Sequence, residues 1–359
     1  MAEPVDWSTA TRVGRLVARG DRLGSSYLAD SLATDFERVT AESESLVRDF
    51  TRLDSPGIAR AGVVDRSGWI DANVASMRRL LGSLNTHITD RLSTGPVGVL
   101  GRHTAGTELG VVLGYMSQRV LGQYDLLMGE VGDAADGDIV FYVGPNVLLL
   151  EKRFGFRPLE FRRWIAIHEL THRAQFTAVP WLRPYFLSLV DGMLGGIEPD
   201  PRALLRALAR SAEALSRGKN PLDEAGLVGL FASDEQKDLL AKTQALMSLL
   251  EGHGNYVMNV LGAKHVHGVE RMEKALHARR AVGGIAGQVN KALGLEMKLR
   301  QYEVGERFIK ELVDIAGFAA LDVAWSDPGA LPTLPEFADA KMWLTRVDST
   351  RVLRARDSR

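Results

Sequence analysis

Residues 168–172 read His-Glu-Leu-Thr-His, and this spacing of two histidines and a glutamate is the strongest chemical signal in the chain. The surrounding segment, residues 161–176, contains no glycine or proline, and its apolar residues recur at helical spacing. Positions four apart share one face of a helix, so the imidazoles of His168 and His172 can bind one metal ion. The carboxylate of Glu169 would then lie beside the open coordination position, where a water binds.

Three other interpretations of the motif compete with a catalytic zinc site. An exposed helical turn could have the same sequence. The apolar flanks, however, predict partial burial, and burying ionisable groups that have no binding partner costs free energy. Glu169 and His172 also form the Glu-x-x-His unit of di-iron bundles, which need a second such unit, and the chain has none. Metzincins continue the motif with a glycine and a third histidine, and this chain has Gln175 and Ala178 there.

A third protein ligand is expected from residues 246–261, an apolar helical stretch interrupted by the polar cluster Glu-Gly-His-Gly-Asn. Glu251 is the preferred ligand, and Asn255, one turn later, would accept a hydrogen bond from a ligand histidine and fix its tautomer. His253 competes with Glu251, because the two lie about 200° apart around a helix and only one can easily face the histidine pair. Each intervening glycine costs about 1 kcal/mol in a helix, which indicates close approach of another element.

Amide hydrolysis also requires a donor that stabilises the oxyanion of the tetrahedral intermediate. Tyr302 is the preferred candidate for this catalytic role, with His253, Lys298 and Arg300 as alternatives. Glu169 is expected to accept a proton from the zinc-bound water and to deliver it to the leaving amine.

The predicted function is a zinc-dependent metallohydrolase, with peptide or protein as substrate. The alternative is a metal-stabilised helical binding or assembly protein without activity, and hydrolysis of another kind of amide is a third option. Glu169 favours catalysis, because a structural zinc site uses four protein ligands and needs no carboxylate beside an open position.

Composition excludes several other classes of protein. The 359 residues contain 44 Lys and Arg against 45 Asp and Glu, a balance that predicts no nucleic-acid partner. The absence of cysteine excludes disulfides and thiolate ligands, which leaves histidines and carboxylates to bind zinc. Neither a signal peptide nor an apolar run long enough to span a membrane is visible, so we expect a cytoplasmic protein without a membrane partner.

The expected fold is mainly α, a zincin-like metallopeptidase fold with a short β element near the active-site helix. A strand is expected at residues 138–143, and it would form an edge along the active-site cleft. Residues 54–68 and 91–104, which contain Pro and Gly, are expected to be loops. Three regions are expected: N-terminal helices (1–105), a catalytic core (106–325) and a C-terminal tail (326–359). Long helices are expected at residues 25–53, 69–84, 107–128, 161–176, 234–261 and 296–318.

Segments 114–125, 142–146, 161–176, 250–255 and 296–302 are similar to those of a known family. The chain resembles the zinicin-like metallopeptidases of type 2, an actinobacterial group also called the coenzyme F420 biosynthesis-associated family. The resemblance implies a mostly helical zincin-like fold and zinc peptidase activity, with His168, Glu169 and His172 at the metal-site positions. The family label that mentions F420 reflects a genomic association, so flavin-type cofactor binding is not predicted from it. The family often has Asp at the position of Asn255; an amide there can still accept a hydrogen bond but adds no negative charge.

Overall fold

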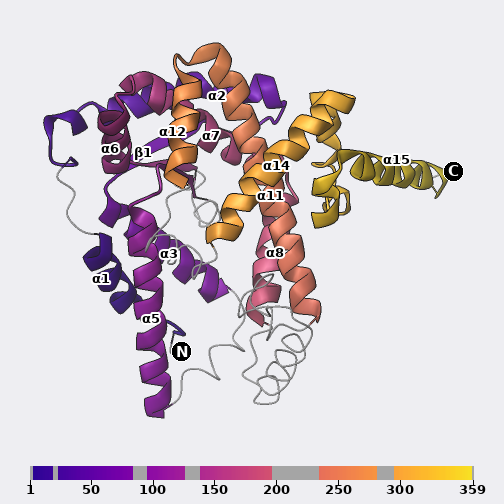
Figure 1. The fold of residues 1–359 in the computed structure, drawn as a ribbon. Helices are drawn as coiled ribbons and strands as arrows, with labels where there is room; N and C mark the ends of the chain where they lie inside the picture. The colour runs from indigo at the N-terminus through magenta and orange to yellow at the C-terminus, as the bar shows by residue number, and fades with distance from the viewer. Residues whose placement is uncertain are drawn as a thin grey trace, which may run out of the picture.

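The computed structural model describes residues 3–18, 23–83, 95–125, 138–195, 234–280 and 295–357. These residues form a mostly helical protein with one small sheet, which confirms the expected fold class (Figure 1). The longer helices are α1 (Trp7–Ala18), α2 (Leu32–Thr51), α3 (Arg66–Ser83), α5 (Gly95–Ser117), α6 (Gly144–Phe154), α7 (Pro158–Ala178), α8 (Leu182–Gly195), α11 (Asp234–His265), α12 (Val269–Arg280), α14 (Leu295–Ala316) and α15 (Ala340–Asp357). Short 3-10 helices are η1 (Tyr27–Ala29), η3 (Phe318–Val323), η4 (Pro328–Ala330) and η5 (Leu334–Ala338).

The sheet has three strands in the order β1-β3-β2. The central strand β3 (Ile139–Val143) pairs in parallel with β1 (Arg60–Val64) and antiparallel with β2 (Gly122–Tyr124). The strand expected at residues 138–143 is therefore confirmed, but its expected position at the edge was wrong. Within the described part of the chain, the edge strand beside the motif helix α7 is β2.

Both outer strands lie in segments for which the sequence predicted another structure. β1 lies in the expected loop 54–68, where Gly62 leaves room for neighbouring side chains: a Cβ there would be 3.0 Å from Ile139 and 3.1 Å from Phe141. β2 lies in the expected helix 107–128, and the expected loop 91–104 instead contributes to α5. The buried Asn146 explains the early end of α5, because its amide donates to the carbonyls of Ser117 and Val120 at 2.7 Å each. Such a long-range contact leaves no mark in local periodicity.

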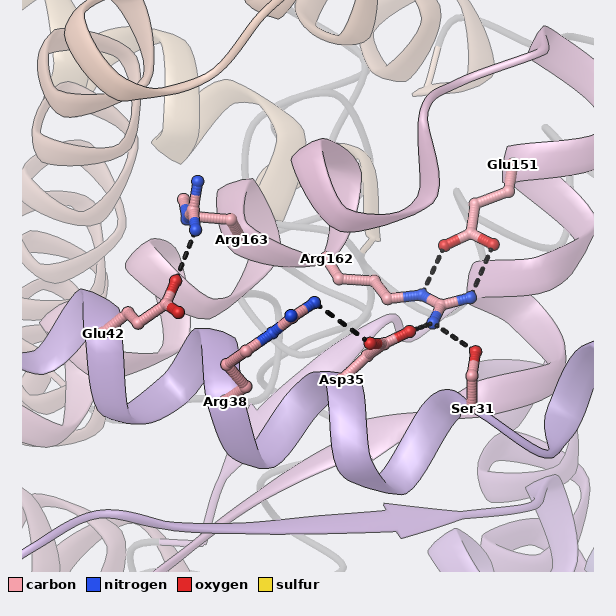
Figure 2. Close-up of polar contacts among 7 residues, drawn as sticks. All are labelled: Ser31, Asp35, Arg38, Glu42, Glu151, Arg162 and Arg163. Carbon is pink, nitrogen blue, oxygen red and sulfur yellow. Dashed lines mark hydrogen bonds and ion pairs between the residues drawn. The ribbon is translucent and has the colours of Figure 1, made fainter.

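The motif helix α7 lies in the core, with α2, α11 and β2 packed against it. Trp164, Ile167 and Leu170 are almost completely buried, so the hydrophobic effect holds α7 in place over most of its circumference. Figure 2 shows a polar contact that fixes its first turns. The guanidinium of Arg162 lies between Glu151 of α6 and Asp35 of α2, and this contact sets the position of α7 relative to both helices.

The helices α11 and α14 cross with their backbones in contact. A Cβ on Gly252 would lie 2.3 Å from the carbonyl carbon of Gly305, and one on Gly305 would lie 1.9 Å from the carbonyl oxygen of Ser248. Only glycine fits both positions. The expectation that glycine permits a close approach here is confirmed.

The C-terminal segment packs on the core through Trp343 of α15, whose indole donates to the carbonyl of Ala330 at 2.8 Å and whose ring contacts Phe308 of α14. The proposed division into three regions stays a prediction. In the described residues, no helix combines the length and the apolar character that crossing a lipid bilayer requires.

Candidate metal centre

Two imidazoles of α7 and one carboxylate of α11 converge in the structure. The Nε2 atoms of His168 and His172 lie 3.1 Å apart. The Oε2 atom of Glu251 lies 3.7 Å from the first and 3.5 Å from the second. Ligand atoms bound at 2.0–2.1 Å to a tetrahedral zinc are separated by roughly 3.3 Å, so the three observed distances fit one face of such a tetrahedron.

The donor set also fits a metal chemically. Two imidazole nitrogens and one carboxylate oxygen are a common ligand set of catalytic zinc, which leaves the fourth position open. Both histidine side chains are only 15–17% exposed and the Glu251 side chain 8%, so solvent would screen a charge at their centre only weakly. The His/His/Glu cluster therefore fits a metal site.

Gly254 of α11 gives the two imidazoles their space. A Cβ at this position would lie 3.1 Å from Cε1 of His168 and 3.2 Å from Cε1 of His172. The rings meet edge to face, with their planes at 86°. The two glycines of the polar cluster therefore have separate functions: Gly252 permits the crossing with α14, and Gly254 permits the approach of the histidines.

The electrostatics of the cluster favour positive charge. Burial alone would lower the pKa of His172, but the hydrogen-bonding contact with Glu251 and its negative charge raise it. Glu169 adds a smaller electrostatic effect and Gln175 a hydrogen bond, and together these groups bring the pKa of His172 to about 9. A site that binds a proton this strongly is also suited to bind a metal cation in its place.

Glu169 lies beside the edge strand β2. Its side chain is buried, with 7% exposed, and it contacts the backbone of Gly122. A Cβ at Gly122 would be 2.6 Å from Cγ and 2.8 Å from Oε1 of Glu169. The sequence interpretation missed Gly122, because a glycine within an expected helix showed no sign of lying next to the motif.

The hydrogen-bond partner of His172 differs from the expected one. Asn255 is buried, and its Oδ1 has no hydrogen-bond partner among the described residues, so the predicted bond to a ligand histidine is wrong. The Oε1 of Gln175 instead lies 2.9 Å from Nδ1 of His172. Gln175 is three residues after His172 on the same helix, and this spacing was the signal that could have identified it.

His253 does not belong to the cluster of possible ligand atoms. Its ring is 1% exposed and packs against Phe318 and Trp325, and its Nδ1 lies 2.9 Å from Nε2 of Gln175. Burial, followed by the charge of His172, lowers the pKa of His253 to about 3, which keeps this imidazole neutral. The structure thus places Glu251, and not its competitor, beside the two histidines.

The remaining candidates are on α14. Tyr302, Lys298 and Arg300 belong to this helix, which packs against α11, but their side chains lie outside the part of the structure that is described. The oxyanion role of Tyr302 stays a prediction.

Nearly the whole chain is similar to known proteins in sequence and in fold. A crystal structure from Chloroflexus aurantiacus, titled that of "a putative hydrolase with a novel fold", is similar with a TM-score of 0.69 and 26% sequence identity. The similarity covers 96% of this chain and 99% of that one. No curated protein matches the chain. The model of the zincin-like metallopeptidases matches residues 5–344. The chain therefore belongs to the zincin-like metallopeptidase family.

Proposed function

We propose that this protein is a zinc-dependent peptidase in which His168, His172 and Glu251 bind the metal and Glu169 is the general base. The observation that carries the proposal is the convergence of two Nε2 atoms and one Oε2 atom at 3.1, 3.5 and 3.7 Å. Zinc, when bound, supplies a Lewis acid that polarises a carbonyl and acidifies a water. The finer assignment to the actinobacterial, F420-associated group stays a prediction from the segments quoted above.

The position of Glu169 supports its proposed role. It follows the first histidine directly, and its charge contributes to the raised pKa of His172, so the carboxylate acts on the cluster electrostatically. Its contact with Gly122 restricts the side chain on the side of the sheet. A carboxylate held in this way can accept a proton from water and pass it to a leaving amine.

The proposed substrate is a peptide or protein segment in extended conformation. Within the described residues β2 is the edge strand nearest α7, and its Gly122 contacts Glu169. A peptide that added to this edge by backbone hydrogen bonds would pass directly along the general base. Tyr302 is proposed as the donor to the oxyanion, because it is on the helix that crosses α11.

Zinc content and turnover together test the proposal. Purified wild-type protein should hold one zinc per chain by elemental analysis and should cleave members of a library of unstructured synthetic peptides, read by mass spectrometry. His168→Ala should lose the zinc. Glu169→Gln should keep it and lose activity by about 10²–10⁴-fold, the usual contribution of general acid–base catalysis.

Two results would contradict the proposal. Full peptide cleavage by Glu169→Gln would exclude Glu169 as the base. Stoichiometric zinc without cleavage of any library peptide by the wild type would favour the alternative, a metal-stabilised binding or assembly protein.

A further inference from the structure

The amide of Gln175 lies between the partly buried His172 and the buried His253, and it contacts both α7 and α11. Its Oε1 is 2.9 Å from Nδ1 of His172 on its own helix α7. Its Nε2 is 3.0 Å from the carbonyl oxygen of Leu250 and 2.9 Å from Nδ1 of His253, both on α11. All three contacts are within hydrogen-bond distance, and Gln175 is fully buried.

The contact with Leu250 determines which way the amide points. A backbone carbonyl can only accept hydrogen bonds, so the group facing it must be the NH2 of Gln175 and not its oxygen. In the flipped orientation, two oxygens would meet at 3.0 Å without a proton between them. The oxygen of Gln175 therefore faces His172.

The orientation of the amide then determines where both histidines carry their protons. An amide oxygen only accepts, so Nδ1 of His172 must donate, and the neutral ring has its lone pair on Nε2. That Nε2 is the atom 3.1 Å from His168 and 3.5 Å from Glu251. At the other end, the second amide N–H must find an acceptor, which is Nδ1 of His253, so that ring carries its proton on Nε2.

His253 is well suited to hold the amide in place. Its ring packs against Phe318, with centroids 5.9 Å apart, and against Trp325 at 5.4 Å. The indole of Trp181 donates to the carbonyl of Trp325 at 2.8 Å, which fixes that end of the stack. Leu250 directly precedes Glu251, so the same amide also ties the carboxylate-bearing segment of α11 to α7.

We propose that Gln175, held by Leu250 and His253, is a positioning residue that keeps the proton of His172 on Nδ1 and thereby directs the Nε2 lone pair to the metal site. The inference rests on the proposed function, because it assigns the lone pair to a zinc ligand. It gives His253 a positioning role in place of the ligand or oxyanion role that the sequence left open.

Zinc affinity, measured by competition with a chromophoric chelator, tests the role of the amide. Gln175→Met keeps the length of the side chain and removes the acceptor, and it should weaken zinc binding by about 10–100-fold, as expected for partners of ligand histidines. Gln118→Met is the matched control. That amide donates to the backbone carbonyls of Val17 at 3.0 Å and Gly114 at 3.2 Å. These acceptors belong to α1 and α5, and the proposed zinc ligands belong to α7 and α11, so zinc affinity should be unchanged.

His253→Phe separates positioning from ligation. Phenylalanine can occupy the aromatic stack but cannot accept the amide proton, so this variant should still hold one zinc per chain, with affinity reduced about tenfold, at the low end of the same range. Loss of all zinc, as for His168→Ala, would make His253 a ligand and overturn the inference.

A spectroscopic measurement on the wild type covers the case in which a variant does not fold. In zinc-loaded protein with ¹⁵N-labelled histidine, long-range ¹H–¹⁵N spectra should show the proton of His172 on Nδ1 and that of His253 on Nε2. A bare Nδ1 on His172 would overturn the inference, as would unchanged zinc affinity in Gln175→Met. If the wild-type protein binds no zinc, the proposed function itself fails. If the wild type binds zinc but Gln175→Met binds it equally well, only the inference about Gln175 fails.

Discussion

Helix α7 contributes to two polar clusters that differ in what balances the charge of their carboxylates. Near its start, Arg162 donates to Glu151 at 2.8 and 3.0 Å, to Asp35 at 2.5 Å and to Ser31 at 3.1 Å (Figure 2). Two carboxylates thus face a cation that the chain itself supplies. Such a cluster is complete without any ligand.

Further along the same helix, the second cluster gathers two imidazoles and the carboxylate of Glu251. The neighbouring Arg173 does not serve it, because its guanidinium donates to Glu44 at 2.7 Å and to Asp138 at 2.8 and 2.9 Å. Among the described contacts of the second cluster, positive charge comes from a proton on His172, and a bound cation can take the place of that proton. The comparison teaches that burial of acidic groups is not itself a sign of a metal site. The sign is the convergence of two imidazole nitrogens and one carboxylate oxygen on one point.

The largest effect is expected from a substitution that disrupts the first cluster, around Arg162. Arg162→Met leaves Glu151 without its cation and leaves Asp35 to the exposed Arg38, 3.3 Å away (Figure 2). Loss of one member of a buried ion pair costs about 3–5 kcal/mol of unfolding free energy. Urea denaturation measures this loss. Arg163→Met is the matched control: Arg163 is more exposed and pairs with Glu42 at the surface, so its loss should cost about 0–1 kcal/mol. Equal costs would show that Arg162 is not the internal counter-ion described here.

The next largest effect is expected at Glu169, the proposed general base beside the second cluster. A methyl group in Gly122→Ala would displace the side chain of Glu169, and a misplacement of about 1 Å can reduce turnover roughly 10²-fold. Zinc content should not change, because the contact involves no proposed ligand. Gly62→Ala places a methyl group in the same sheet but against Ile139 and Phe141, and it should leave turnover per folded molecule unchanged. Loss of zinc in Gly122→Ala would contradict the separation of base and ligands.

The smallest expected effect is the pH dependence of zinc affinity, which should distinguish the second cluster from the first. The pKa of His172 is raised to about 9, so in the metal-free protein its protonation contributes stability that is fully present below about pH 6.5 and is lost as pH rises through about 9. Zinc must displace that proton, so its apparent affinity should rise by up to about tenfold per pH unit and level off above pH 9. Chelator competition between pH 7 and 10 measures this slope.

The contribution of Arg162 supplies the internal comparison. A guanidinium keeps its charge throughout this range, so the stability lost in Arg162→Met should be the same at pH 7 and pH 10. A zinc affinity independent of pH would show that His172 holds no proton for the metal to displace.

Sequence by itself determined what lies within a single helix. The spacing of His168 and His172 fixed a shared face, because 3.6 residues per turn is a property of the local backbone. The absence of glycine and proline around the motif, and the helical spacing of its apolar residues, predicted the helix that carries the two histidines. The glycines beside Glu251 and His253 predicted a close approach that the crossing with α14 confirms.

Tertiary structure decided what lies between elements. Whether Glu251 or His253 faces the histidines depends on the rotation of α11 about its axis, and this rotation follows from packing at Gly252 and Gly254. The strand β2 beside Glu169, and Gln175 in place of Asn255 as the partner of His172, likewise depend on contacts between residues distant in the chain. Periodicity reports the conformation of one segment, whereas these choices reflect the free energy of packing several segments together, which no single segment encodes.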